Sequence, residues 1–297
     1  MPVLEIERLQ RYRVPEAHDI YDPRDTILYA LGTGAGLAAQ VDELDFVFER
    51  NLKALPSMAF VLGTPGFWPM DPAAGLDWPR ILHGEQSLVL YRPLEAQGEL
   101  IGTTRIGEIA DKGPGKPALV RAYRTLTDVS GAKVAEMSEV WVLRGAGGFG
   151  GERMLSGPPP VVVPEAPATH SLDLPTSLQQ PLIYRLSGDR NPLHVEPQTA
   201  QVGGFDKPIL HGLSSLGLAV RALVNMHCGG DPMRLSSVAA RFTAPVFPGD
   251  TIRTQSWREE GRIVFRATAT ERDVVVIDSG TATVDCFAGH GGSPSRR

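Results

Sequence analysis

The stretch LIYRLSGDRN (182–191) repeats, in altered form, the earlier stretch ILYALGTGAG (27–36). The two copies carry a tyrosine and a leucine at matching positions. Further along, YRPLEAQGEL (91–100) parallels FTAPVFPGDT (242–251), because each is an extended run followed by a proline, a loop and a glycine next to an acid. Self-similarity of this kind indicates that one folding unit has been duplicated.

The length of the chain fits two such units. Its 297 residues are 42% apolar and 21% charged, which is typical of globular proteins, and two domains of about 150 residues are expected. Residues 145–168 hold six glycines and five prolines, which disfavour helix and sheet interior alike. We therefore predict an N-terminal unit over 1–150, a linker over 151–168 and a C-terminal unit over 169–297, each with its own core.

The order of elements within each unit indicates an α+β fold. A helical segment comes first, and alternating apolar and polar residues then predict antiparallel strands with turns near Val129–Ala132 and Glu271–Asp273. Apolar residues three or four apart predict a long helix over His211–Met226, packed against the sheet. The first unit instead has residues 46–80, rich in Pro, Gly and aromatics, and such an insertion often shapes a binding site.

Composition excludes several classes of function. The formal charge is 29 − 34 = −5 with no basic cluster, so nucleic acid is not an expected partner. The two cysteines, Cys228 and Cys286, are too few for a disulfide framework and, with scattered histidines, lack zinc-site spacing. GTGAG (32–36) follows a helical pattern rather than a strand, which argues against a dinucleotide loop. We expect no cofactor and no metal.

The chain shows no signal of export or membrane insertion. Its N-terminus is charged, and its most apolar stretch, Met58–Met70, is interrupted by glycine and proline. The tail GGSPSRR lacks the Ser-Lys-Leu peroxisomal address. A cytoplasmic location with no membrane association is the expectation.

Acid and base groups occur in only one of the two copies. Where the first copy reads GTGAGLA, the second reads SGDRNPLH (187–194). The Asn191-Pro192 turn can bring Asp189 and His194 together, so that they hold one water and exchange its protons, and Asn191 could help to fix that water. The alternative interpretation is an ordinary Asp-Arg-Asn-Pro turn with a surface histidine.

A second polar element precedes the long helix. In KPILHG (207–212) the glycine lets a ligand approach the backbone closely. The first N–H groups of a helix are unpaired and carry partial positive charge, so Gly212 N–H could stabilise a developing oxyanion. The neighbouring His211 is expected to hold the loop at the helix start.

Several motifs together resemble one family. YRLSGDRNPLH (184–194), GFDKPILHGLSSLG (204–217) and ARFTAPVFPGDTI (240–252) resemble the signature of the MaoC-like, type 2 (R-specific) enoyl-CoA hydratases. RDTILYALGTGAG, LDFVFE, LPSMAFVLG, HGEQSLVLYRPL, DKGPG and GAGGFGG resemble, in the same order, stretches of the hydratase region of the peroxisomal multifunctional enzyme.

The resemblance implies a double hot-dog fold, with each half wrapping a sheet around a helix, and a homodimer. The family adds water across the double bond of a trans-2-enoyl-CoA to give the (3R)-hydroxyacyl-CoA. By match, Asp189 and His194 would activate the water, Asn191 would help orient them, and Gly212 would polarise the thioester carbonyl. The first half would shape the acyl pocket. Further family contacts with the ligand fall on His83, Gly84, Lys112, Pro192, Leu193 and Phe242. Arg190 departs from the family, where an aromatic residue is frequent at this position. The resemblance therefore does not define the shape of the pocket there.

Other interpretations of these residues remain open. His83 and Gly84 can simply begin a strand, Lys112 can be a solvated turn lysine rather than a partner for CoA phosphates, and Phe242 can be plain core. The same site could serve a (3R)-hydroxyacyl-carrier-protein dehydratase, for which a basic surface patch is expected. A hot-dog thioesterase would aim water at the carbonyl carbon instead, and a non-catalytic acyl-thioester binder has the least support. The sequence does not define whether the acyl chain is short or long, branched, or a steroid side chain.

Overall fold

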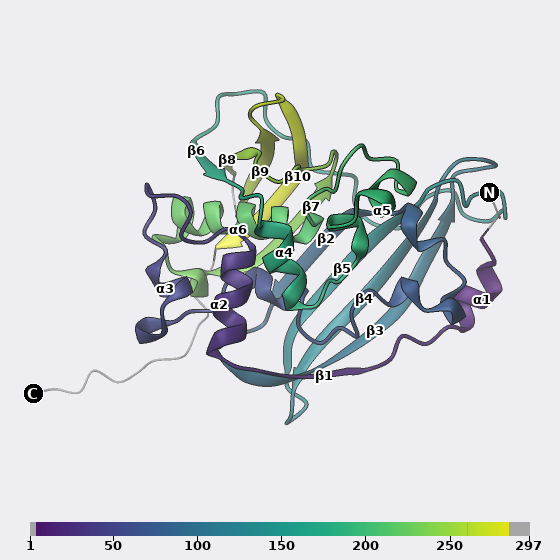
Figure 1. The fold of residues 1–297 in the computed structure, drawn as a ribbon, viewed down its shortest axis with the longest axis horizontal. Coiled ribbons are helices and arrows are strands. Elements are labelled where there is room, and N and C mark those ends of the chain that lie inside the picture. The colour runs from purple at the N-terminus through teal and green to yellow at the C-terminus, as the bar shows by residue number, and fades with distance from the viewer. Residues whose placement is uncertain (1–3, 260, 285–297) are drawn as a thin grey trace, which may run out of the picture.

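The computed structural model describes residues 4–259 and 261–284, which form one curved antiparallel sheet with helices on its concave side (Figure 1). The strand order is β1-β3-β4-β5-β2-β7-β10-β9-β8-β6. The α+β, double hot-dog prediction agrees with this arrangement. The strands are β1 (Ala17–Tyr21), β2 (Ile81–Leu90), β3 (Gly98–Asp111), β4 (Ala118–Asp128), β5 (Lys133–Leu143), β6 (His170–Pro175), β7 (Leu235–Phe242), β8 (Thr251–Glu259), β9 (Arg262–Ala269) and β10 (Val274–Val284).

The strand order itself displays the duplication. Read outward from the centre, the first half runs β2, β5, β4, β3, β1 and the second half runs β7, β10, β9, β8, β6, so each strand has a counterpart five places later in the chain. The halves join where β2 pairs with β7, with Gln86 opposite Ala240 and Leu88 opposite Val238. The predicted turns at Val129–Ala132 and Glu271–Asp273 connect β4 to β5 and β9 to β10.

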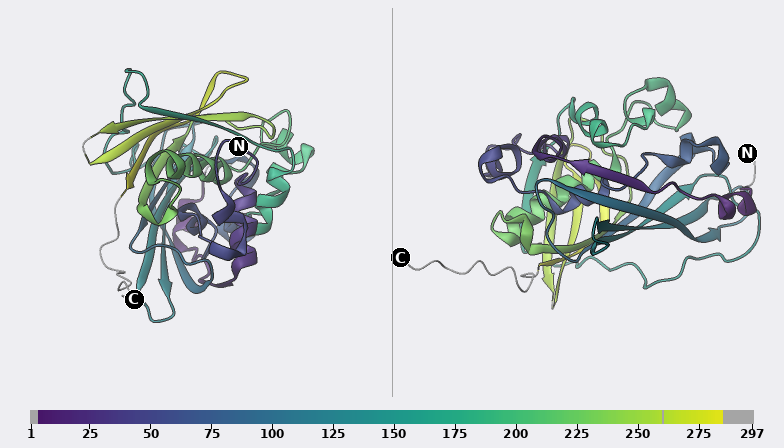
Figure 2. Two further views of the ribbon diagram at one scale, coloured as in Figure 1. Left: turned by 90° about the vertical axis from the view of Figure 1, so that its left-hand side faces the viewer. Right: turned by 90° about the horizontal axis from the view of Figure 1, so that it is seen from below.

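The long helix α6 (Gly212–Cys228) confirms the predicted 211–226 helix, with His211 as its N-cap and Gly229 in the left-handed conformation at its end. Figure 2 shows the strands of the second half passing over it. Leu216, Val220 and Leu223 are fully buried on this helix. The other α-helices are α1 (Ile6–Arg11), α2 (Pro23–Gly32), α3 (Leu44–Val47), α4 (Gln180–Tyr184) and α5 (Pro197–Val202). In the described residues none is long and apolar enough to cross a bilayer.

The described residues of the first half include no counterpart of α6, which corrects the expectation that each half wraps its sheet around a helix. Prolines and glycines break this segment into single turns, and the fully buried turn η2 (Pro56–Phe60) contacts α6 instead. The remaining 3₁₀ turns are η1 (Glu49–Asn51), η3 (Trp68–Met70), η4 (Pro72–Ala74), η5 (Trp78–Arg80), η6 (Arg185–Ser187), η7 (Pro192–His194) and η8 (Pro232–Arg234).

The expectation of two separate cores is also wrong. The largest buried cluster combines Leu88 and Met137 of the first half with Leu218 and Val238 of the second. A fully buried ion pair joins Glu43, which precedes α3, to Arg221 on α6. Because β2 pairs directly with β7, the largest buried cluster spans both halves, while a smaller one around Trp68 and Trp141 lies within the first half.

The Gly/Pro-rich segment has no helix or strand between β5 and β6, as predicted. Its glycine-rich beginning is nevertheless fixed in place, because the Asp111 carboxylate accepts hydrogen bonds from the N–H groups of Gly113, Gly148 and Gly150. Cys228 is buried, whereas Cys286 and the C-terminal tail lie outside the described residues.

Candidate active site

The loop from Ser187 to His194 adopts the turn that the Asn-Pro sequence predicts. Gly188 has φ 129°, a backbone conformation that side-chain-bearing residues rarely adopt, and it lets the chain reverse after η6. Asn191 N–H donates to Asp189 Oδ1 at 3.2 Å, and Asn191 Oδ1 accepts from Leu193 N–H at 3.0 Å. Asn191 therefore caps η7 and fixes the loop that carries both proposed catalytic residues.

A backbone carbonyl sets the tautomer of His194. Nδ1 lies 2.9 Å from Ile209 O, and because a carbonyl can only accept, Nδ1 must carry the proton. Nε2 therefore has a lone pair. Burial lowers the pKa of His194, while attraction to Asp189 partly opposes that shift. A buried, neutral imidazole with a free Nε2 is suited to take a proton from water.

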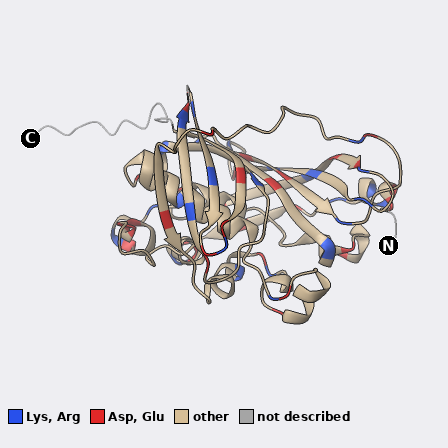
Figure 3. Cartoon of the chain, turned by 90° about the horizontal axis from the view of Figure 1, so that it is seen from above, with Lys and Arg blue, Asp and Glu red and all other residues tan. Residues whose placement is uncertain are grey.

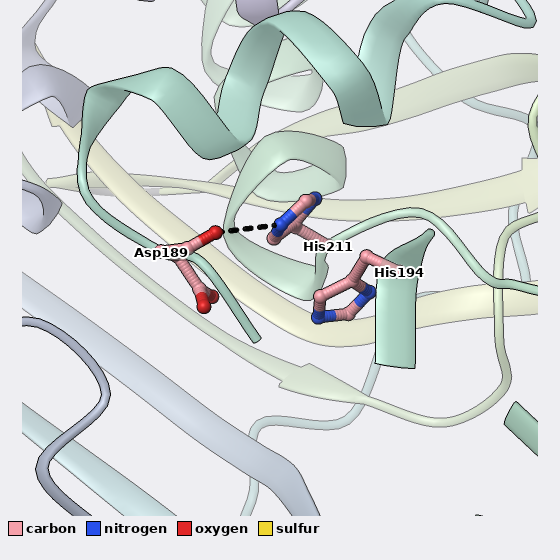
Figure 4. Close-up of side chains that lie close together, drawn as sticks. All are labelled: Asp189, His194 and His211. Atoms are coloured by element: carbon pink, nitrogen blue, oxygen red, sulfur yellow. Dashed lines mark hydrogen bonds between the residues drawn. The ribbon is translucent and has the colours of Figure 1, made fainter. Parts of the chain in front are cut away.

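His211 holds the loop at the start of α6, as the sequence predicts. Its Nε2–H donates to the Asp189 backbone carbonyl at 3.1 Å, and its ring stacks on that of His194 with 3.7 Å between centroids (Figure 4). Burial, and then the neighbouring His194, hold the pKa of His211 well below its usual value. A neutral His211 thus ties the catalytic loop to the start of α6.

Asp189 and His194 do point toward a common space. One carboxylate oxygen of Asp189 and one ring nitrogen from each of His194 and His211 lie within 4.8 Å of one another. One water can bridge such a separation. Each imidazole uses one ring nitrogen in a hydrogen bond to a backbone carbonyl. The second nitrogen of each ring and the Asp189 carboxylate are the groups of this cluster that could hold a metal ion. The expectation of no metal stays a prediction.

The Gly212 amide opens α6 and borders the same space. Within the described chain no acceptor pairs with this N–H, as expected for the first residue of a helix. A Cβ at this position would lie 3.4 Å from the Phe242 ring. Glycine here keeps the passage between helix and ring open, and the amide remains available to a ligand oxygen.

The site opens into a cavity of about 300 Å³. The 46–80 segment contributes an apolar part of its wall, including Phe60, Val61, Phe67 and Trp68. Eight of the ten predicted site residues line this cavity: Asp189, His194, Asn191, Gly212, His83, Gly84, Leu193 and Phe242. Lys112 and Pro192 do not line it. Lys112 begins the turn after β3, and Pro192 begins η7.

His83 lies on β2, with its ring 4.9 Å from that of Phe242 and its Nε2 3.1 Å from Glu85 O. Burial lowers the pKa of His83 to about 4, so this wall of the cavity is neutral near pH 7. The sequence interpretation missed Arg124 and Glu139, which face the same cavity from β4 and β5. Their signal is a charged residue at an inward position of an alternating strand.

Comparison with known proteins identifies the family. Residues 20–145 match the MFE-2 hydratase 2 N-terminal domain, and residues 161–279 match the MaoC like domain. The 3-hydroxyacyl-thioester dehydratase Y of Mycobacterium tuberculosis is 45% identical over 86% of this chain and 90% of its own length. The peroxisomal enoyl-CoA hydratase 2 of Arabidopsis thaliana is 36% identical over 91% and 92%.

The chain belongs to the MaoC-like, type 2 enoyl-CoA hydratase family. A solved structure of a MaoC-like dehydratase from Phytophthora capsici superposes on this hydratase with a TM-score of 0.81, at 34% identity and over 95% of this chain and 99% of that one. A Mycobacterium tuberculosis protein with a double hot-dog fold superposes with a TM-score of 0.57 at 14% identity, which supports the fold alone. The recognition made from the sequence motifs is therefore confirmed.

Proposed function

We propose that this hydratase adds water to trans-2-enoyl-CoA thioesters to give (3R)-3-hydroxyacyl-CoA, and that it also catalyses the reverse dehydration. The observation that carries this proposal is the meeting of three groups at one cavity. The Asp189 carboxylate, the free Nε2 of His194 and the unpaired Gly212 amide all border it. Acid, base and oxyanion donor are the groups that conjugate addition of water requires.

The chemistry follows from these positions. A water held between Asp189 and His194 gives a proton to His194 Nε2 as its oxygen bonds to C3 of the substrate. The electrons of the double bond move onto the thioester oxygen, where the Gly212 N–H and the positive end of α6 stabilise the negative charge. The dyad then returns a proton to C2, and the thioester carbonyl re-forms.

The carrier-protein dehydratase is the second candidate, since the same groups can remove water from a hydroxyacyl thioester. The relative from Mycobacterium tuberculosis is named a thioester dehydratase, which leaves the carrier of that thioester unspecified. Lysines and arginines are interspersed with acidic residues over the strands of the face drawn in Figure 3, rather than gathered into a patch. This side of the molecule therefore offers no basic patch to an acidic carrier protein.

The deciding experiment follows crotonyl-CoA with purified protein. Loss of the enoyl absorbance with formation of (3R)-hydroxybutyryl-CoA is expected, whereas release of free CoA would indicate a thioesterase. In His194→Gln we expect kcat to fall about a hundredfold to ten-thousandfold, the usual contribution of general acid–base catalysis. His18→Gln is the matched control, because that histidine is exposed and pairs with Glu99 on β3. Full hydration by His194→Gln would contradict the proposal.

We further propose a homodimer and a cytoplasmic location. The described sheet ends in the edge strands β1 and β6, and hot-dog sheets with open edges tend to associate. Light scattering of the purified chain tests the dimer. Several relatives, such as the Arabidopsis enzyme, carry "peroxisomal" in their names, so imaging of the tagged protein in its own cell must decide the location.

A further inference from the structure

Two charged side chains line the cavity from strands of the first half of the sheet. Arg124 lies on β4 and Glu139 on β5. The register places Arg124 opposite Met137 and Ala122 opposite Glu139, so the two charged residues are diagonal neighbours on one face of the sheet. The surrounding wall is mostly apolar, with Phe60, Val61, Phe67, Trp68, Trp141, Leu82 and Val142 among its residues. Such a pair is costly to bury and has no part in the acid–base chemistry described above.

The pair is only partly satisfied by the protein, because Glu139 is hydrogen-bonded with Trp141 whereas Arg124 keeps an unpaired nitrogen. Arg124 Nη2 donates to Phe60 O at 2.6 Å and touches Met137 Sδ at 3.5 Å, but its Nε is buried with no hydrogen-bond partner. Arg124 and Glu139, both within the described chain, attract each other without coming within the 4.0 Å of an ion pair. A buried guanidinium edge is therefore left free beside a carboxyl group, with a gap between them.

Burial disfavours the charged form of both groups. It lowers the pKa of Arg124 and raises the pKa of Glu139, while the charge of Arg124 and the hydrogen bond with Trp141 lower the pKa of Glu139 and the charge of Asp189 raises it. The influence of Asp189 places the pair within electrostatic reach of the reacting groups, on another wall of the same cavity. An acyl chain that extends past the catalytic loop would thus pass the pair.

The chemistry of the gap selects among acyl chains. A chain of methylene groups offers no acceptor to Arg124, so its buried Nε would stay unpaired. A carboxylate would meet the charge of Glu139, and a keto oxygen could accept from Arg124 but offer nothing to Glu139. A hydroxyl group can accept from the guanidinium and donate to the carboxylate at the same time. We propose that the pocket takes acyl chains that carry a hydroxyl beyond the reacting carbons, held between Arg124 and Glu139.

The inference rests on the proposed function for the orientation of the chain, but its first test is binding alone. Saturated acyl-CoAs of one length, without a hydroxyl or with one at each successive carbon beyond C4, are titrated calorimetrically against the wild-type protein. At one or more positions the hydroxylated chain should bind about tenfold to a hundredfold more tightly, as expected for a hydrogen bond to a charged group. Equal affinity at every position would overturn the inference.

Variants then locate the preference. Arg124→Met should remove it and Glu139→Gln should reduce it. Arg105→Met should leave it intact, because Arg105 is an exposed arginine of the adjacent strand β3 that lies over the Tyr123 ring at 4.0 Å. A preference that survives in both Arg124→Met and Glu139→Gln would refute the assignment. Failure of wild-type protein to hydrate crotonyl-CoA would contradict the proposed function instead, because binding of saturated chains requires no turnover.

Discussion

Two loops at matching places in the duplicated halves differ in what their side chains contact. The loop 33–43 follows α2 in the first half, and the loop 187–194 follows α4 and η6 in the second. The second loop presents Asp189 and His194 to the cavity. The first has no acid or base there, and its Glu43 and Thr33 carbonyl bind Arg221 of α6 instead. In the proposed mechanism one copy of the loop does chemistry, while the other holds, as a clamp, the helix that both share.

The two loops are packed closely enough for this division to matter. Tyr29 and Tyr184, at matching positions of the two copies, have ring centroids 5.9 Å apart. A Cβ on Gly32 would lie 2.8 Å from the Tyr184 Cα, and one on Gly217 of α6 would lie 2.5 Å from the Thr33 side chain. The two loops are therefore linked through close packing of the helices that precede them, α2 and α4.

The largest expected effect comes from breaking the clamp. Arg221→Met leaves Glu43 buried without its partner, so the free energy of unfolding should fall by about 3–5 kcal/mol. Denaturant titration measures the loss. The double variant Arg221→Met with Glu43→Met should recover part of it, since no charge then remains buried. A single variant as stable as wild type would mean that the first loop does not act as a clamp.

The next effect concerns the helix that both loops share. Gly212→Pro removes the proposed oxyanion donor while keeping the helix, because proline suits the first helical position and His211 already has the extended ψ of 133° that a following proline favours. We expect kcat/KM to fall about a hundredfold to a thousandfold relative to Gly212→Ala, which adds a similar side chain but retains the N–H. Similar rates in the two variants would exclude the amide from catalysis.

Acid should destabilise the loop 187–194 more than the loop 33–43. Burial lowers the pKa values of His194 and His211, so the folded protein binds fewer protons here than the unfolded chain. The stability from these neutral imidazoles is present above the unfolded histidine pKa and is lost as pH falls through it. Amide hydrogen exchange, divided by the intrinsic exchange rate at each pH, should therefore rise more between pH 7 and pH 5 in residues 187–194 than in residues 33–43. The activity of the folded protein should decline only at still lower pH, because the pKa of His194 is lowered in the fold. A greater rise in the clamping loop would reverse the comparison.

The smallest effect uses one glycine from each loop. Gly36 and Gly188 both have positive φ, 80° and 129°, and neither would bring a new Cβ closer than 3.4 Å to a neighbour. Alanine at either site should cost about 1–2 kcal/mol of stability through backbone strain. Only Gly188→Ala should also lower kcat, because that turn sets the position of Asp189. Equal kcat values for the two variants would show that the catalytic turn tolerates displacement.

The parts of this molecule that depend on local pattern could be predicted from the sequence. The Asn-Pro turn fixes the Asp189 and His194 neighbourhood, and the spacing of Leu216, Val220 and Leu223 fixes α6. The parts that depend on pairing across distance could not. Nothing local indicates that β2 joins β7, or that Arg221, an interruption of an apolar stripe, finds Glu43 more than a hundred residues away. The alternation of each strand could have indicated that Arg124 and Glu139 point inward, but only the pairing of β4 with β5 brings the two together.

The β2–β7 seam has one more consequence. The covalent crossing between the halves, through the proline-rich part of residues 145–168, forms no helix or strand, while backbone pairing, the common interior and the Glu43–Arg221 contact hold the halves together without it. Cleavage of the polypeptide in that crossing would leave two fragments that remain assembled as one catalyst. Encoding each fragment as a separate subunit is therefore expected to give a heterodimer with the same active site.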